Sequence, residues 1–245
     1  MDDCIRHHGT LLKIKQQGIF LASQKDSLLK LVPQNGCPDP FEINIADQLT
    51  VIAFDSEWWL NPEPARNDDG DCNCKTKDEV LAQLKALVDK NRGKMIFLAS
   101  HHPFLTYGSH GGYKNIPVFG GLYRAIRLAF PSRQDVAHPL YRNMIKRVNS
   151  VLVDVPHVIH IAGHDHGLQL NKDGYLQVVS GSGAKTSSLV KGEHALFADS
   201  RQGYVIADLM SDNKIKLRFF VSKFNEVTEV FTILIKANAS DKTRS

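Results

Sequence analysis

Three short apolar runs predict the buried strands of a sheet. They are residues 49–55 (LTVIAFD), 94–100 (KMIFLAS) and 158–162 (VIHIA). Strands that are covered on both faces, as in parallel sheets, show such continuous β-branched and aromatic runs instead of strict alternation. Residues 41–45 alternate apolar and polar positions and predict a further strand. Residues 61–75, between the first two runs, are polar and predict an exposed loop.

A helix is predicted between the first two runs. Thr76 and Glu79 can form a capping box, in which each side chain accepts a hydrogen bond from the other residue's backbone N–H. The apolar positions that follow fall on one helix face: Val80, Leu81, Leu84, Leu87 and Val88. Arg92-Gly93 ends the helix. Residues 49–100 therefore read as a strand–helix–strand unit with parallel strands.

Two further segments have helical character. Residues 10–32 carry clustered but imperfectly periodic leucines and isoleucines, and residues 122–152 are mostly helical with a break near Pro131 and Pro139. The long stretch between the second and third apolar runs begins with a loop, residues 101–121, that is rich in glycine and histidine. Because long loops inside compact domains usually serve function, this loop is a candidate site.

After the third apolar run the pattern changes to successive antiparallel strands. We expect them at residues 168–170, 175–180, 203–209, 214–221 and 227–236. The connections 171–174 (NKDG) and 211–213 (SDN) have the residues of hairpin turns. The predicted fold class is thus mixed α/β (α+β), with a βαβ unit followed by antiparallel β-hairpins. We expect one domain over residues 1–237 and a polar tail over 238–245.

Two of the apolar runs end directly in histidine-bearing loops. The second run is followed by His101-His102-Pro103, and the third by Gly163-His164-Asp165-His166. In open α/β sheets ligands gather at the carboxyl ends of parallel strands, so both loops are expected at the same edge. Neutral imidazole is a common ligand of zinc, iron and manganese-like centres. The combination predicts a metal site, whereas four other histidines are expected to be capped or hydrogen-bonded surface residues: His138, His157, His160 and His194.

Charge and hydropathy narrow the function classes. The formal net charge of +4 is spread along the chain, so there is no nucleic-acid-binding signature of a concentrated basic face. There is no apolar run of the eighteen or more residues that a transmembrane segment needs. Residues 1–4 (MDDC) are acidic and unlike the start of a secretory signal. The oligomeric state has no signature in the sequence.

The four cysteines leave two interpretations open. Cys72-Asn73-Cys74 is one residue too short for a zinc knuckle. A disulfide bond between Cys37 and either Cys72 or Cys74 is one interpretation, because both loops flank the same predicted strand. Free thiols at the surface or in half-buried positions are the other.

Several short segments carry a resemblance to a known family. They are 35–38 (NGCP), 54–60 (FDSEWWL), 101–103 (HHP), 109–112 (SHGG), 163–166 (GHDH) and 180–185 (SGSGAK). With these segments the chain resembles the calcineurin-like metallophosphoesterase superfamily, in particular the bacterial branch allied to purple acid phosphatases. The similarity runs over most of residues 10–235. It implies the C-terminal part of a four-layer αββα sandwich.

The resemblance also implies roles for the histidines. His101 and His164 would bind one metal ion and His166 its partner, in a site that holds two divalent ions (Fe, Mn or Zn) in the intact family. His110 would contact the phosphate of a phosphate ester substrate or protonate the leaving group. His102 would lie behind the ligands or contact the substrate. The implied activity is metal-dependent phosphoester hydrolysis, and the implied location is extracytoplasmic, or periplasmic.

Other motifs of the family have no credible counterpart. Its Asp-x-His, Gly-Asp and Gly-Asn-His motifs precede the His-x-Pro motif, and Gly70-Asp71 follows no predicted strand. We therefore expect a truncated metallophosphoesterase domain that is weak or inactive alone, because a two-metal site needs the bridging carboxylate. Two alternatives are a non-catalytic remnant that binds a metal or a partner, and a hydrolase with a single zinc ion on three histidines. The sequence leaves the kind of phosphate ester open.

Overall fold

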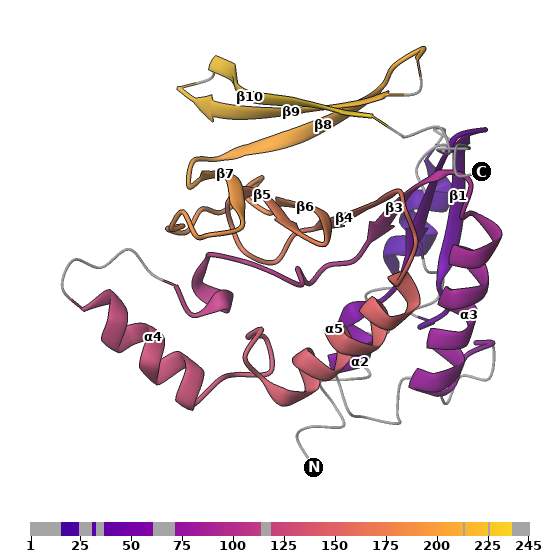
Figure 1. The fold of residues 1–245 in the computed structure, drawn as a ribbon, viewed down its shortest axis with the longest axis horizontal. Coiled ribbons are helices and arrows are strands. Elements are labelled where there is room, and N and C mark those ends of the chain that lie inside the picture. The colour runs from indigo at the N-terminus through magenta and orange to yellow at the C-terminus, as the bar shows by residue number, and fades with distance from the viewer. Residues whose placement is uncertain are drawn as a thin grey trace, which may run out of the picture.

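A computed structural model describes residues 16–24, 31–32, 37–60, 72–113, 119–212, 214–224 and 226–236. The larger of its two sheets has seven strands in the order β1-β2-β3-β4-β6-β5-β7 (Figure 1). These strands are β1 (Phe41–Ala46), β2 (Leu49–Ala53), β3 (Met95–Ala99), β4 (Val158–Ala162), β5 (Leu168–Asp173), β6 (Tyr175–Ser180) and β7 (Ala195–Asp199). The smaller sheet has the order β10-β9-β8. Its strands are β8 (Gly203–Leu209), β9 (Lys214–Lys223) and β10 (Glu226–Lys236).

The centre of the larger sheet is parallel. Strands β2, β3, β4 and β6 pair in parallel, whereas β1, β5 and β7 pair antiparallel at the two sides. Helix α3 (Lys77–Lys90) connects β2 to β3, which confirms the predicted βαβ unit. The capping box is also present, since Glu79 N donates to Thr76 Oγ1 at 3.2 Å and Thr76 N donates to Glu79 Oε2 at 2.9 Å.

The elements form three layers, with the larger sheet in the middle (Figure 1). Helices α2 (Ser56–Leu60), α3 and α5 (Pro139–Leu152) pack on one face of it through one apolar cluster. The other face packs on the smaller sheet, where the contact is a second apolar cluster built around Phe97, Leu168 and Phe219. This arrangement confirms the expected mixed α/β class with antiparallel hairpins. The boundaries 1–237 and 238–245 stay predictions, because residues 237–245 lie outside the described part.

Some local predictions differ from the structure. Residues 56–60, for which no helix is predicted, form helix α2, because Asp55 Oδ1 accepts a hydrogen bond from Trp58 N at 2.9 Å and so caps the first turn. Trp58 and Trp59 are buried in the apolar cluster beneath the helices. Strand β7 has no counterpart among the predicted strands, because its five residues carry no clear alternation of apolar and polar positions.

Two predicted segments fall partly or wholly outside the described residues. Helical structure is present over 16–23, and the flanking residues of the predicted segment 10–32 are only partly described. Gly70-Asp71 lies outside the described part as well. Among the residues that the structure describes, no helix is long and apolar enough to cross a membrane.

Helix α4 (Gly120–Ala129) buries none of its residues, unlike α2, α3 and α5. It lies apart from α2, α3 and α5 (Figure 1). Large apolar side chains in and next to it are about half exposed or more: Phe119, Leu122, Ile126, Leu128 and Phe130. Arg127 joins the helix to the rest of the protein through an ion pair with Asp135.

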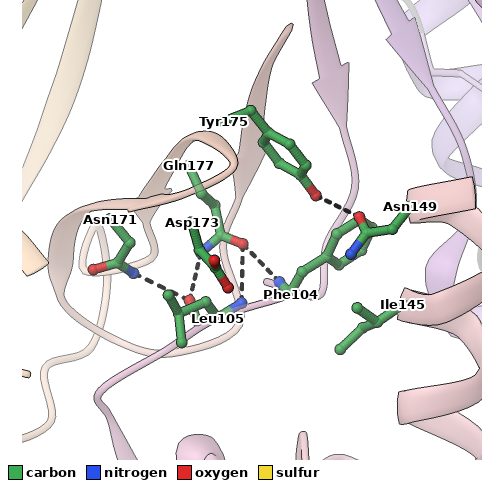
Figure 2. Close-up of a pocket in the computed structure, with 8 residues that line it drawn as sticks. All are labelled: Phe104, Leu105, Ile145, Asn149, Asn171, Asp173, Tyr175 and Gln177. Atoms are coloured by element: carbon green, nitrogen blue, oxygen red, sulfur yellow. Dashed lines mark hydrogen bonds between the residues drawn. The ribbon is translucent and has the colours of Figure 1, made fainter. Parts of the chain in front are cut away.

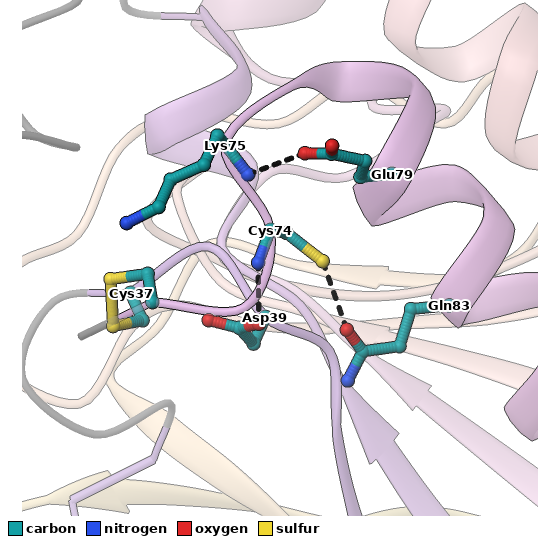
Figure 3. The surroundings of a disulfide bond; sticks show 7 residues. Cys37, Asp39, Cys74, Lys75, Glu79 and Gln83 are labelled. Carbon is teal, nitrogen blue, oxygen red and sulfur yellow. Dashed lines mark hydrogen bonds between the residues drawn. A yellow bond between two sulfur atoms is a disulfide. The ribbon is translucent and has the colours of Figure 1, made fainter. Parts of the chain in front are cut away.

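A disulfide bond links the segment before β1 to the segment before α3 (Figure 3). The structure pairs Cys37 with Cys72, at a Cα–Cα distance of 5.3 Å, and thereby decides between the two partners that the sequence left open. Cys74 is a buried free thiol whose Sγ donates to Gln83 Oε1 at 2.9 Å. Burial and the nearby Asp39 carboxylate raise the pKa of Cys74 to about 12.

The disulfide bond should contribute measurably to stability. It closes a loop with a sequence separation of 35, so Cys72→Ser is expected to lower the free energy of unfolding by about 3–4 kcal/mol through the entropy of the unfolded chain. Urea denaturation measures this change, and non-reducing peptide mapping identifies the bridge. Cys74→Ser is the matched control and should retain the bridge. A bridge that survives Cys72→Ser would contradict the pairing.

Candidate metal centre

The two histidine-bearing loops meet at the carboxyl ends of β3 and β4. His101 follows β3, His164 follows β4, and Gly163 N donates to His101 O at 3.0 Å between the two loops. The side chains of His101, His102 and His164 offer nitrogen atoms that all lie within 4.8 Å of one another. This is the kind of group that can hold a metal ion.

His101 and His164 face each other most directly. His101 Nε2 and His164 Nδ1 are 3.2 Å apart, and His164 Nε2 lies 2.9 Å from the carbonyl oxygen of Gln134. Because a carbonyl only accepts, His164 carries its proton on Nε2 and its lone pair on Nδ1. Two nitrogen ligands of a tetrahedral zinc ion, with bonds of about 2.0–2.1 Å, lie about 3.3–3.4 Å apart. The observed separation therefore fits two ligands of one ion.

Both rings are held in the neutral form that a metal ligand needs. Burial lowers the pKa of His164 to about 4, and the neighbouring His110 adds to this effect. Burial also lowers the pKa of His101, although the Glu57 and Asp55 carboxylates act in the opposite direction. Asp55 lies between β2 and α2, and Glu57 lies in α2.

The backbone at His164 adopts an unusual conformation. Its φ of 65° lies in the left-handed region, which residues other than glycine seldom occupy. Such conformations persist only where the surrounding structure imposes them, and they concentrate at functional sites. Asp165 N donates to Gly163 O at 2.8 Å, and this tight turn imposes the conformation here.

His102 is held from both sides by protein groups. Ser56 Oγ lies 2.8 Å from its Nδ1, and Gln134 Oε1 lies 2.9 Å from its Nε2. The ring is fully buried, and burial lowers its pKa to about 3. Gln134 Nε2 donates in turn to Glu57 Oε2 at 3.1 Å. His102 thus holds the side chain of Gln134, and the backbone carbonyl of Gln134 fixes the proton of His164 on Nε2. We call His101 and His164 the facing pair.

His110 and His166 lie around the facing pair. The His110 ring packs on the His164 ring with centroids 4.0 Å apart. His110 Nδ1 is 3.2 Å from Asp135 Oδ1. The imidazole of His166 is not part of the three-histidine group, while its carbonyl accepts from Ser187 N at 2.7 Å. The expected role of His166 as a ligand of a second ion stays a prediction, as do the roles of His110 and His102.

Buried polar side chains of β5 and β6 hold the loop that carries these histidines. Gln177 Oε1 accepts from Phe104 N at 2.7 Å and from Leu105 N at 3.1 Å (Figure 2). Asn171 Nδ2 donates to Leu105 O at 3.1 Å (Figure 2). Gln169 Oε1 accepts from Tyr107 N at 2.9 Å. The strands thus supply partners for backbone groups that the loop would otherwise bury unpaired.

Asp165 fixes the next part of the same loop. This fully buried carboxylate accepts from Thr106 Oγ1 at 2.6 Å, from Ser109 Oγ at 3.2 Å and from His110 N at 3.3 Å. Gly108 passes so close that a Cβ atom there would lie 2.5 Å from Asp165 Cγ. Asp165, the third residue of the Gly-His-Asp-His motif, therefore holds the backbone of His110 in place.

Two residues of the site had no signal in the sequence. Gln134 and Asp135 lie in the turn between α4 and α5, in a segment that the sequence indicates only as a helix break.

His160 is fully buried between Ser100 Oγ, at 2.8 Å, and Gln177 Oε1, at 3.1 Å, so it is hydrogen-bonded as expected but lies in the interior. His138 caps α5 by accepting from Leu140 N.

The close approach at Gly108 predicts a stability effect. Gly108→Ala should lower the free energy of unfolding by about 1–3 kcal/mol, because the new methyl group overlaps the buried Asp165 carboxylate. Gly93→Ala is the matched control and should be close to neutral, because an added Cβ there meets nothing within 4 Å. Urea denaturation of both variants measures the difference. Equal stability of the two variants would be inconsistent with this packing.

Comparison with known proteins supports the fold. No family model matches the sequence, and no curated protein sequence matches it. Among solved structures, GAP50, the anchor in the inner membrane complex of Plasmodium, aligns with a TM-score of 0.54 and 16% identity over 82% of this chain and 54% of that chain. PhoD aligns with a TM-score of 0.53 and 12% identity over 80% of this chain and 41% of that chain.

A purple acid phosphatase, PPD1 from yellow lupin seeds, aligns with a TM-score of 0.48 and 14% identity, over 79% of this chain and 32% of that chain. This chain thus spans about half, or less, of the length of these structures. At such identities the likeness concerns the fold. The chain is similar in fold to part of GAP50 and to part of PhoD, and it carries a histidine group that could bind a metal ion.

Proposed function

We propose that this chain supplies the histidine side of a metal-dependent phosphoester hydrolase of the calcineurin-like metallophosphoesterase superfamily. The observation that carries the proposal is the facing pair, His101 Nε2 and His164 Nδ1, 3.2 Å apart at the ends of two adjacent parallel strands. The fold likeness to PhoD and the segments that resemble purple acid phosphatases support the same reaction class.

Each histidine has a role in this proposal. A divalent ion (Fe, Mn or Zn), when bound, would lower the pKa of a water molecule and polarise a phosphoryl oxygen. His101 and His164 would hold that ion, and His166 would hold a second one in a complete two-metal site. His110, packed on His164, would contact the phosphate of the ester substrate. His102 keeps Gln134 and therefore His164 in place.

The disulfide bond supports an extracytoplasmic location for this activity. Disulfide bonds such as Cys37–Cys72 form and persist in oxidising compartments, and are rare in the cytosol. The resemblance to the bacterial branch allied to purple acid phosphatases indicates the periplasm.

A second candidate function is binding without turnover. Among the residues that the structure describes, the group at the facing pair contains only histidines and no carboxylate. A bridging carboxylate is what a two-metal hydrolase uses to hold its ions together. One of the similar structures, GAP50, is described as an anchor. A hydrolase with a single zinc ion on three histidines and an open fourth position is intermediate between the two-metal hydrolase and the binding function.

Zinc binding to the chain tests the proposed function. Isothermal titration calorimetry should show binding of Zn²⁺, and His164→Ala should weaken it by at least about 100-fold, since even partners outside the ligand shell change affinity 10–100-fold. His157→Ala is the matched control, because His157 precedes β4 at the opposite end of the strand. Equal zinc affinity of the wild type and His164→Ala would contradict the metal site.

Hydrolysis of an aryl phosphate separates the candidate functions. Slow turnover that depends on zinc and is lost in His164→Ala supports the hydrolase. Zinc binding at one ion per chain without turnover favours the binding function. Activity that persists with one zinc ion per chain and is lost in His166→Ala supports the single-zinc case.

A further inference from the structure

The turn between α4 and α5 carries a buried carboxylate that the reaction scheme above does not use. Asp135 is 2% exposed. One of its oxygen atoms accepts from Ser132 N at 2.7 Å and from Ser132 Oγ at 2.9 Å. The other accepts from a nitrogen of Arg127 and lies 3.2 Å from His110 Nδ1. The carboxylate thus has partners at both oxygen atoms.

The partners other than His110 are enough to keep Asp135 in place. A buried carboxylate is costly unless it is paired and hydrogen-bonded. Arg127, from α4, supplies the opposite charge, and Ser132 supplies two further donors. The turn is also joined to the histidine loop through the backbone, since Val136 N donates to His110 O at 2.9 Å. The position of the Asp135 carboxylate therefore does not depend on its contact with His110.

This acceptor decides which ring nitrogen His110 offers to a ligand. A carboxylate only accepts, so His110 Nδ1 carries a proton and donates it to Asp135. Nε2 is then the nitrogen that remains for another partner. The ring packs on His164, and the side chain of His110 is 24% exposed, so the imidazole is partly open to solvent. Asp165 accepts from the backbone N–H of His110, so this hydrogen bond does not set which ring nitrogen carries the proton.

We propose that Asp135 is a positioning residue, which holds His110 in the Nδ1–H tautomer and directs Nε2 toward the phosphate group of the substrate. This inference rests on the proposed function, because it assumes that a phosphate ester binds at the facing pair. Asp135 itself does not touch the substrate. Arg127 and Ser132 act one step further back, by orienting the carboxylate that orients the imidazole.

The tautomer of His110 can be measured without metal or turnover. Long-range ¹H–¹⁵N spectra of the histidine rings in the metal-free chain at neutral pH show which nitrogen carries the proton, and His110→Gln assigns the His110 signals. We expect a protonated Nδ1 and an unprotonated Nε2 in the wild type. In Asp135→Ala this preference should be lost. A wild-type His110 that carries its proton on Nε2 would overturn the proposal, even if Asp135→Ala does not fold.

A control variant separates the effect at His110 from the loss of an ion pair elsewhere in the protein. Asp199 in β7 forms an ion pair with Arg201 and is mostly buried. Asp199→Ala should leave the His110 tautomer as it is in the wild type. Circular dichroism and thermal melting show whether each variant keeps its fold. An unchanged tautomer in folded Asp135→Ala would also overturn the proposal.

Phosphate binding tests the consequence for the site. With the zinc-loaded chain, inorganic phosphate should bind about tenfold more weakly to Asp135→Ala, because the unprotonated Nε2 is then no longer oriented to accept a hydrogen bond from the P–OH group of the phosphate ion. Asp135→Asn, which keeps an oxygen acceptor for Nδ1–H, should recover most of the affinity, which a merely structural role would not predict. Equal phosphate affinity in wild type and Asp135→Ala contradicts the positioning role. If zinc does not bind at all, the proposed function fails, whereas the tautomer spectra still decide the role of Asp135.

Discussion

The parallel pairing of β3 and β4 is the constraint on which the candidate site depends. The strands pair in register, with Leu98 opposite His160 and Ala99 opposite Ile161, so they end at the same level. The hydrogen bond from Gly163 N to His101 O continues this pairing into the loops. A shift of register by one residue would turn each side chain to the other face of the sheet. The facing imidazoles exist because the two strands end together.

Behind the facing pair lies a layer of buried polar side chains with defined partners. Ser56, His102 and Gln134 form one chain of contacts, and Asp165 holds the histidine loop from the other side. Such networks specify a single arrangement when every member has a partner, and are costly when one is lost. The geometry of the histidines thus depends on groups that would never touch a metal ion or a substrate themselves.

Local features of the structure could be predicted from the sequence, whereas contacts between distant segments could not. The three apolar runs and the capping box at Thr76 can be recognised from neighbouring residues alone. The structure contains the three strands and the capping box that they predict. The histidine loops could be placed at one edge because parallel strands end there. By contrast, Gln169 and Gln177 look like ordinary strand positions, yet their amides bind a loop more than sixty residues away in sequence. Nothing in the periodicity of a strand indicates such a partner.

Helix α4 and His110 are connected through the Asp135 carboxylate. The helix buries none of its own residues, and Arg127 connects it to Asp135, the same carboxylate that accepts from His110. A displacement of α4 that withdraws Arg127 would remove the opposite charge from the buried Asp135 carboxylate, and the carboxylate would then be expected to move. The position of helix α4 and the orientation of the His110 imidazole therefore depend on the same ion pair between Arg127 and Asp135.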